Sequence, residues 1–253
     1  MKQTIPTILF LFLFVHSGFS QWDVDSSYVK PDVKVKPSYA NGTIAMGNGV
    51  FGIQLTGGIS YDEVKSGYTA VQKNNPSITE DIKVGPGGGT GFEIYMGRKL
   101  NKVFRIGLHV GYQSASGTPE IKGATVRFSK FYLLPMMNLG IPIRTKNHLN
   151  IGLGSYISFA NKYNIKPPPS SADPRIEVYY KPNAGIATHF TYEHSFAPAA
   201  SFYTGLRFHW TTLVVDHVDV NGQQIILNSK VKSLFDNKNG GGVAFVLGLN
   251  FIF

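Results

Sequence analysis

Three consecutive residues, Glu193, His194 and Ser195, are of the types that cooperate in nucleophilic catalysis. A serine becomes a nucleophile when a histidine takes its proton and a carboxylate orients that histidine, all within hydrogen-bond reach. The three residues lie in a stretch of alternating apolar and polar residues, which is typical of a β-strand. Alternate strand residues point to opposite faces, so His194 is expected to point away from Glu193. We therefore predict no catalytic residue and keep a lipid hydrolase as a minor alternative.

Two other stretches resemble ligand-binding motifs only superficially. The run Gly85 to Gly91 is rich in glycine, like a phosphate-binding loop, but it lacks the Gly-Lys-Ser/Thr ending and no helical pattern follows. A flexible loop is expected there. The seven histidines show no HExxH or other metal-ligand spacing. The sequence thus predicts no cofactor and no metal site.

Alternation of apolar and polar or small residues recurs eight times after Gly49, with turn residues between the stretches, and this is the pattern of β-strands. In most stretches one face is continuously apolar. The predicted strands lie within 51–56, 92–97, 104–112, 131–143, 149–159, 183–193, 202–211 and 241–253. The pattern predicts an all-β fold.

The connections between these strands alternate strictly in length. Short ones fall around 99–102, 144–148 and 196–200, and long ones span 62–90, 113–124, 162–175 and 216–240. Short turns on one side and longer loops on the other characterise membrane-spanning barrels, whose short turns face the periplasm. We therefore predict an eight-stranded antiparallel up-and-down transmembrane β-barrel, with the final strand ending at the periplasmic rim.

Charged and imidazole side chains occupy the face opposite the apolar one. An eight-stranded barrel is just wide enough to be filled by side chains. Lone buried charges are costly, so those inside should be paired. In the two tight hairpins, Glu93 is expected near His109, Glu193 near Tyr203, and His189 near Arg207. Two interpretations remain open, a structural polar plug and a site for a proton or solute. The predicted network comprises Glu93, Arg105, His109, His189, Glu193, Arg207 and His209.

The amino-terminal residues 1–20 carry Lys2, an apolar run from Ile8 to Val15 and small residues before Gln21, the pattern of a secretory signal peptide. Residues 21–48 show no sustained period and are expected to form an irregular periplasmic leader. Residues 49–253 form the barrel domain. The chain has no cysteine, so disulfides and thiol chemistry are excluded. Its formal net charge is +9. For an exported chain, anionic lipid headgroups are a better partner than nucleic acid.

The last stretch, Gly241 to Phe253, places six large apolar residues at alternate positions and ends on an aromatic residue. It resembles the carboxy-terminal targeting strand of Gram-negative outer-membrane β-barrels. That resemblance implies that Phe251 and Phe253 contribute to recognition by the barrel-assembly machinery. Eight residues separate Phe202 from Trp210, which at about 3.3 Å per residue and a tilt of about 40° spans roughly 20 Å of membrane. Both residues are therefore placed in the aromatic girdles.

The block Tyr132 to Leu139, aromatic and apolar residues around Pro135, is similar to a block of the outer-membrane β-barrel domain family that includes PorT-like and porin-family proteins. The resemblance covers roughly 49–253. It implies the fold and the membrane, and it leaves open an accessory role in protein export.

We expect a non-catalytic outer-membrane protein with a structural or surface-interaction role through its long extracellular loops, since loops on a rigid scaffold commonly carry binding. The alternative is a narrow channel or transporter for small or apolar solutes. Expected partners are outer-membrane lipids and lipopolysaccharide, with an extracellular or export-machinery protein as a further candidate. Lys122, Arg127 and Lys130 are expected at the outer rim, where they either meet lipopolysaccharide phosphates or are simply solvated.

Overall fold

The computed structural model describes residues 48–72, 75–101, 103–118, 124–168, 171–226 and 229–253. The chain divides into two compact units, Met1–Ile44 and Ala45–Phe253. The first unit lies outside the described residues, and with it the predicted signal peptide and most of the predicted leader. All that follows concerns the second unit.

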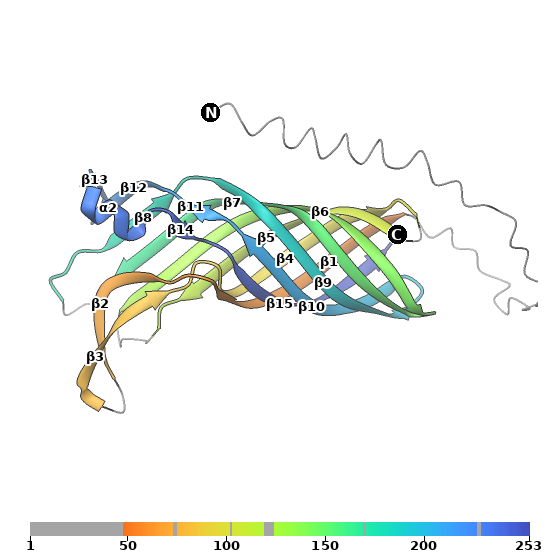
Figure 1. Ribbon diagram of the computed structural model, residues 1–253, viewed down its shortest axis with the longest axis horizontal. Helices are drawn as coiled ribbons and strands as arrows, with labels where there is room; N and C mark the ends of the chain where they lie inside the picture. The colour runs from red at the N-terminus through yellow and green to blue at the C-terminus, as the bar shows by residue number, and fades with distance from the viewer. Residues whose placement is uncertain (1–47, 73–74, 102, 119–123, 169–170, 227–228) are drawn as a thin grey trace, which may run out of the picture. The chain divides into compact units, whose positions relative to one another are not determined.

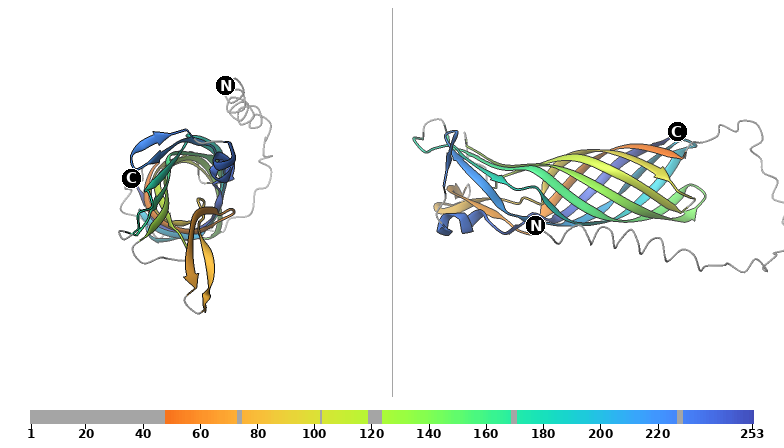
Figure 2. Two further views of the ribbon diagram at one scale, coloured as in Figure 1. Left: turned by 90° about the vertical axis from the view of Figure 1, so that its left-hand side faces the viewer. Right: turned by 90° about the horizontal axis from the view of Figure 1, so that it is seen from above.

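Within the described residues, eight antiparallel strands close into a barrel, which confirms the predicted fold class (Figures 1 and 2). Each strand pairs with the next one around the ring, and pairing between β7 and β9 closes it. The eight wall strands are β1 (Gly49–Ser60), β4 (Gly89–Lys99), β5 (Phe104–Ser116), β6 (Thr125–Arg144), β7 (Asn147–Lys166), β9 (Asn183–Ala197), β10 (Ala200–Trp210) and β15 (Gly242–Ile252). Six of them contain a predicted strand whole, and β10 and β15 each omit at most one residue at either end of theirs.

The register of the pairs fixes the geometry of the barrel. Partners can be followed once around the ring, from Val50 through Gly97, Gly107, Met136, Gly154, Ala187, His209 and Gly242 to Ser60. The path begins at Val50 and returns to β1 at Ser60, so the shear is ten residues (60 minus 50). For eight strands this shear corresponds to a strand tilt of about 40°, the range of closed membrane barrels.

Apolar and polar side chains are sorted to opposite faces of the wall as the alternation predicts. The outward rows expose large apolar side chains all around the barrel, among them Leu55, Phe92, Leu153, Phe190 and Phe245. In water such a continuous surface would be costly, and in a membrane it replaces lipid–lipid contact. The outward rows therefore form a lipid-facing belt.

Inward glycines make room for inward tyrosines. The ring of Tyr95 lies where a Cβ on Gly97 or Gly107 would be, and Tyr203 fills the same space at Gly248. Tyr132 does so at Gly111. An aromatic ring laid over a cross-strand glycine shields the bare backbone. This pairing explains why many of the small residues at inward positions are glycines.

The two ends of the barrel differ. The short connections, the start of β1 and the carboxy-terminus share one end, where Gly49 and Phe253 exchange two backbone hydrogen bonds of 3.1 and 3.0 Å. We call it the short-turn end. The four long connections lie at the other end (Figure 2). Among the described residues, no helix is long and apolar enough to cross a membrane.

Much of the sequence predicted as long loops is folded. β8 continues the wall past the belt by pairing with the extended part of β7. β12 pairs with β8 and turns back into β13 at Asn221 and Gly222. Both turn residues have positive φ, 52° and 82°, the signature of a type I′ hairpin turn. The added elements are β2 (Val64–Gln72), β3 (Asn75–Val84), β8 (Ile176–Tyr180), β11 (Thr212–Leu213), β12 (Val215–Val220), β13 (Gln223–Ile225), α2 (Ser229–Phe235) and β14 (Lys238–Asn239).

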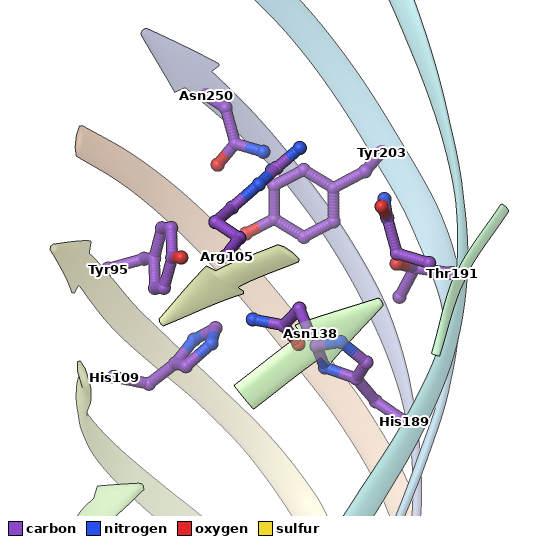
Figure 3. A pocket seen from close by; sticks show the side chains of 9 residues that line it. Tyr95, Arg105, His109, Asn138, His189, Thr191, Tyr203 and Asn250 are labelled. Carbon is purple, nitrogen blue, oxygen red and sulfur yellow. The ribbon is translucent and has the colours of Figure 1, made fainter. Parts of the chain in front are cut away.

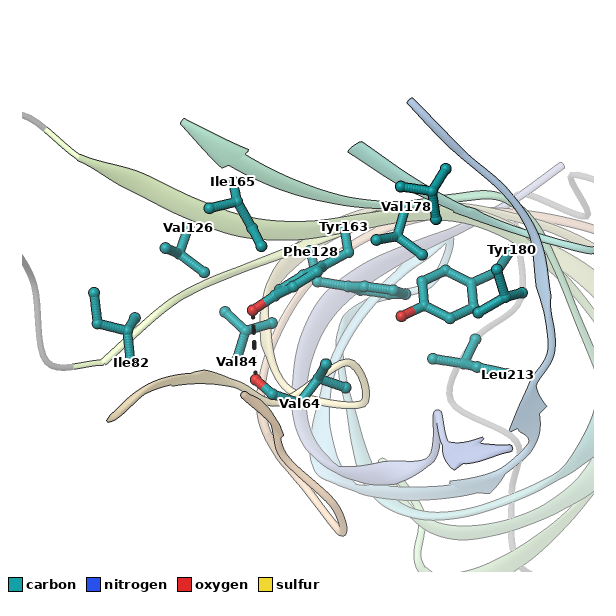
Figure 4. Close-up of a cluster of buried hydrophobic side chains, with 12 residues drawn as sticks. Val64, Ile82, Val84, Val126, Phe128, Tyr163, Ile165, Val178, Tyr180 and Leu213 are labelled. Atoms are coloured by element: carbon teal, nitrogen blue, oxygen red, sulfur yellow. Dashed lines mark hydrogen bonds between the residues drawn. The ribbon is translucent and has the colours of Figure 1, made fainter. Parts of the chain in front are cut away.

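These elements enclose an apolar core of their own (Figure 4). Phe128 and Tyr163, from the extended ends of β6 and β7, pack with side chains of β2, β3, β8 and β12, and Phe235 of α2 packs against them. The Tyr163 hydroxyl donates a hydrogen bond of 3.4 Å to the Val64 carbonyl oxygen. We call β2, β3, β8, β12, β13, α2 and the extended ends of β6 and β7 the cap. Hydrophobic burial makes the cap a folded layer at the mouth of the barrel.

The glycine-rich segment before β4 is another departure from the expected flexible loop. Pro86, Gly87 and Gly88 are buried. Gln113 donates hydrogen bonds to the carbonyl oxygens of Gly87 (3.3 Å) and Gly88 (2.9 Å), and the Gly87 amide donates to Ser60 Oγ (2.9 Å). A Cβ on Gly87 would collide with the Gly241 backbone. Glycine is required because two backbones touch there.

Candidate functional site in the barrel lumen

Glu93 on β4 is the centre of one polar cluster inside the barrel. Its carboxylate is fully buried and accepts a two-point ion pair from Arg207 on β10, with Nη2 at 2.9 Å from Oε2 and Nη1 bonded to Oε1. Gln54 donates to Oε2 at 2.6 Å, and the Tyr132 hydroxyl donates to Oε1. His109 Nδ1 lies 3.2 Å from Oε2. Hydrogen bonds from Arg207, Gln54 and Tyr132, with His109 close by, compensate the desolvation of this carboxylate.

Glu193 on β9 forms a second cluster nearer the short-turn end. Arg105 Nη2 lies 3.1 Å from Glu193 Oε2, and Asn150 donates to the same oxygen at 2.9 Å. Ser201 Oγ and Asn250 Nδ2 donate to Oε1 at 2.5 and 3.3 Å. This carboxylate is also buried and fully bonded. Both clusters tie distant strands together across the lumen, and neither presents a free carboxylate.

A third layer lies on the cap side of Glu93. The Lys130 side chain is 1% exposed, and its Nζ lies 3.4 Å from His209 Nε2 and 3.2 Å from the Gly240 carbonyl oxygen. The same ammonium lies 5.1 Å from the centre of the Tyr156 ring, a cation–π contact. Tyr156 stacks on His209 and on Tyr132, with ring centres 4.6 and 5.1 Å apart. The expectation that Lys130 lies at the outer rim is wrong. The strand begins at Thr125, so Lys130 lies within it and not beyond its end. Lys130 lies two positions before Tyr132, so both side chains lie on the inward face.

The structure brings together most of the charged residues predicted for the lumen but pairs them differently. The register places Glu193 opposite Tyr203 and His189 opposite Arg207, as the hairpin argument predicts. The ionic partner of Arg207 is nevertheless Glu93, and that of Glu193 is Arg105. Sequence reasoning could align neighbours in a tight hairpin, whereas contacts across the lumen depend on the shear and tilt of the closed barrel.

Further buried polar residues lie in the lumen that sequence reasoning left out of the network, and four of them donate to Glu93 or Glu193. The further residues are Gln54, Lys130, Asn138, Asn150, Ser201 and Asn250, all buried. Every one occupies an inward position of its strand. The signal that would have found them is the alternation itself, applied to uncharged side chains as well as charged ones.

The Glu193, His194 and Ser195 combination does not assemble. Glu193 points into the lumen, whereas His194 pairs through Nδ1 with Asn147 Oδ1 at 2.7 Å, and its ring lies tilted against that of Phe202, an outward residue, with centres 5.5 Å apart. Within the part of the chain that the structure describes, no group of histidines and carboxylates has the arrangement of a metal site. Chemically, the described lumen offers bonded carboxylates and no activated nucleophile.

The four predicted girdle residues face outward. Phe202 and Trp210 are 36% and 45% exposed, and Phe251 and Phe253 are 41% and 71% exposed. Trp210 stacks with Tyr61, ring centres 6.1 Å apart, near the cap end of the belt. The Phe253 ring lies over Gly49, where a Cβ would be 2.6 Å from its Cε2.

A charged cluster also lies on the cap. Glu177 on β8 accepts from Lys162 Nζ at 2.8 Å and from the Tyr179 hydroxyl at 2.9 Å, and it pairs with Arg175. Burial by itself raises the pKa of Glu177, but these donors outweigh it and lower the pKa to about 2. His217 stacks on the Tyr179 ring with centres 4.4 Å apart. The cluster joins β7, β8 and β12 outside the belt.

The closed ring, the apolar belt and the filled polar interior define a transmembrane β-barrel of the small eight-stranded class.

No protein-family model matches the sequence, and no curated protein matches it. Several solved structures are similar in fold, among them the following three. Neisserial surface protein A (NspA) is 10% identical, with 81% of this chain and 97% of that chain covered and a TM-score of 0.45. Ail, the attachment invasion locus protein of Yersinia pestis, is 12% identical over 82% and 99%, with a TM-score of 0.40. The outer membrane protein AlkL is 11% identical over 89% and 97%, with a TM-score of 0.40.

Proposed function

We propose that this chain is an integral outer-membrane barrel that serves as a non-conducting anchor and presents the cap for interactions at the cell surface. The single observation that carries the proposal is the cap. Segments of the kind that are irregular loops in many barrels form here a folded layer with its own apolar core. Binding residues gain precision from a rigid support.

The membrane is proposed from the belt and the sidedness of the barrel. Outer-membrane barrels have an apolar band about 25 Å tall, with short periplasmic turns and longer extracellular loops. Phe202 and Trp210 bound an outward row of that order of height on β10. The short-turn end then faces the periplasm, and the cap faces outward.

Non-conduction is proposed from the contents of the lumen. The Glu93 and Glu193 clusters and the Lys130 layer follow one another along the barrel axis, and the apolar core of the cap lies beyond them. An eight-stranded barrel has an interior just wide enough for such side chains. A wide aqueous channel requires more strands, or fewer and smaller side chains in the lumen.

Conductance measurements separate the anchor from the channel alternative. Purified wild-type protein in planar bilayers is expected to show no steady conductance steps. Steady steps whose ion selectivity changes in Arg207→Ala, without a lower unfolding midpoint, would overturn the anchor and make a channel the leading function.

The surface-interaction part has its own test. Cells that display the wild type are compared with cells that display Phe128→Ala, which opens a cavity in the cap core and leaves the belt unchanged. Retention is measured on plates coated with a panel of matrix proteins and polysaccharides. We expect the wild type to be retained on at least one coating and Phe128→Ala to lose that retention. Equal retention on every coating would contradict the role of the cap. The outward Leu153→Ala, in the belt, serves as the control for display level.

A further inference from the structure

A polar cavity of about 30 Å³ lies inside the barrel between the Glu93 and Glu193 clusters (Figure 3). Tyr95, His109, Asn138, His189 and Thr191 are among the residues that line it. A water molecule needs about 10–15 Å³ of such space and two to four polar partners. The cavity therefore has room for one or two water molecules and for nothing much larger.

Six lining residues each direct a buried polar atom that finds no partner among the described residues. All six side chains are at least nine-tenths buried. An unpaired buried polar group costs free energy, so a site with six of them calls for a hydrogen-bonding occupant. The atoms are Tyr95 Oη, His109 Nε2, Asn138 Oδ1, Asn150 Oδ1, His189 Nε2 and Asn250 Oδ1.

The orientation of two of the amides is fixed by their other bonds. Asn150 and Asn250 each use Nδ2 to donate to Glu193, so their Oδ1 atoms are left as acceptors. An acceptor needs a donor, and a tyrosine hydroxyl or an imidazole accepts or donates as required. The set suits a molecule that donates two hydrogen bonds and also accepts them.

Charge balance excludes an ion as the occupant. The two carboxylates, Glu93 and Glu193, are matched by two guanidinium groups, Arg207 and Arg105. A further charge between these pairs would be buried without a counter-charge, and that is costly in a membrane-spanning interior. The occupant is therefore neutral.

Gly152 on β7 lets two of these atoms converge beside the cavity. A Cβ on Gly152 would collide with both Asn138 Oδ1 and His189 Nε2, which occupy the space over the glycine. A methyl group at this position would push both side chains aside and offer no hydrogen bond in their place.

A second cavity, of about 60 Å³, lies at the short-turn end, and Lys99, His148 and Ser195 are among its lining residues. Arg105 lines both cavities. Its guanidinium makes one contact with Glu193 and is 16% exposed. Arg105, a member of the Glu193 cluster, thus lies between the inner cavity and the short-turn end, whereas the Glu93 cluster and the Lys130 layer separate the inner cavity from the cap.

We infer that the lumen contains a specific binding site for one or two water molecules, which bridge the Glu93 and Glu193 clusters and exchange with solvent past Arg105 at the short-turn end only. The inference is independent of the proposed surface role. It implies that the polar network senses the aqueous phase on one side of the membrane.

Magnetisation transfer from water to protein in isotope-labelled micelle samples tests the site. We expect long-lived water contacts at the side-chain amides of Asn150 and Asn250 and at the His189 ring. These contacts should be lost in Gly152→Ala and kept in Gly57→Ala, whose added methyl meets nothing within 4 Å. Assigned wild-type resonances without such contacts, or contacts unchanged in Gly152→Ala, would overturn the site.

Single cysteines test the route, since the chain has none of its own. Thr191→Cys reports on the cavity, and Thr56→Cys lies one inward position past Gln54 on β1, on the cap side of the Glu93 cluster. In an Arg105→Ala background, a small methanethiosulfonate reagent is expected to modify Thr191→Cys and to leave Thr56→Cys unmodified. Modification of both, or of neither, in barrels that remain heat-modifiable would overturn entry past Arg105.

Discussion

Arg207 on β10 and Glu93 on β4 form a two-point ion pair inside the barrel although 114 residues separate them in the chain. Neither residue is on a strand adjacent to the other's, because β1 and β15 lie between β4 and β10. The pair therefore forms only when the intervening strands have closed. The ion pair thus depends on the correct assembly of four neighbouring strands, β4, β1, β15 and β10.

Removing Arg207 should be strongly destabilising. Arg207→Ala leaves the Glu93 carboxylate buried with two hydrogen-bond donors, Gln54 and Tyr132, and breaking a buried pair in this way costs about 3–5 kcal/mol. Unfolding in urea, followed by heat-modifiable gel migration, measures the loss. Arg98→Ala, an exposed arginine on the same strand as Glu93, should change the midpoint little.

A double-mutant cycle separates the interaction between Glu93 and Arg207 from the cost of leaving one of them buried without a partner. Glu93→Gln in the Arg207→Ala background removes the uncompensated charge, so the double variant should be more stable than the sum of the two single losses predicts. Strict additivity of the two changes would show that Glu93 and Arg207 do not interact in the folded protein.

The sequence was sufficient for the wall of the barrel. Each strand alternates because one face meets lipid and the other meets the interior, and this period is visible without any tertiary information. The alternation in connection length predicted the up-and-down topology, and it too is visible without any tertiary information. Local register in the tight hairpins was also predictable, as the Glu193–Tyr203 pair illustrates.

The contents of the barrel and the cap were less predictable. Arg207 meets Glu93 because of the shear of the closed ring, a quantity that no single strand contains. Lys130 was misplaced because its strand runs six residues farther toward the amino-terminus than the apolar stretch that starts at Phe131. The cap strands are short and mixed in composition, and their burial depends on contacts between segments far apart in sequence.

The Glu177 cluster predicts a pH-dependent cap. The pKa of Glu177 is lowered from 4.5 to about 2, so its contribution to stability is fully present above about pH 4.5 and is lost as the pH falls toward 2. At neutral pH, Glu177→Gln should weaken the cap by about 1 kcal/mol, the scale of a partly exposed ion cluster. Hydrogen exchange of the β8 and β12 amides measures this. The wild type and the variant should converge near pH 2, and a difference that grows with acidification would contradict the role of the cluster.

Ala160 marks the point where β7 leaves the barrel and enters the cap. It is exposed and has a φ of 51°, a left-handed conformation that residues with a Cβ adopt at a cost of about 1 kcal/mol. Ala160→Gly should therefore raise the free energy of unfolding, partly offset by the greater entropy of glycine in the unfolded chain. Ala160→Val should lower it by more than 1 kcal/mol, by the same steric argument. A lower urea unfolding midpoint for Ala160→Gly than for the wild type would contradict the inference that the backbone at Ala160 is strained.

Variants can separate the backbone contacts of the carboxy-terminal residue from the contribution of its ring. Phe253 exchanges two backbone hydrogen bonds with Gly49 and lays its ring over that glycine. Deletion of Phe253 removes the backbone pair and the ring, whereas Phe253→Ala removes only the ring.

If the ring is part of the assembly signal, both variants should reduce the yield of heat-modifiable barrel in the membrane. If only the β1–β15 seam matters, Phe253→Ala should assemble normally and the deletion alone should fail. Phe245→Leu, outward and apolar on the same strand, is the control. Equal yields of wild type and deletion would show that the terminal residue contributes neither closure nor recognition.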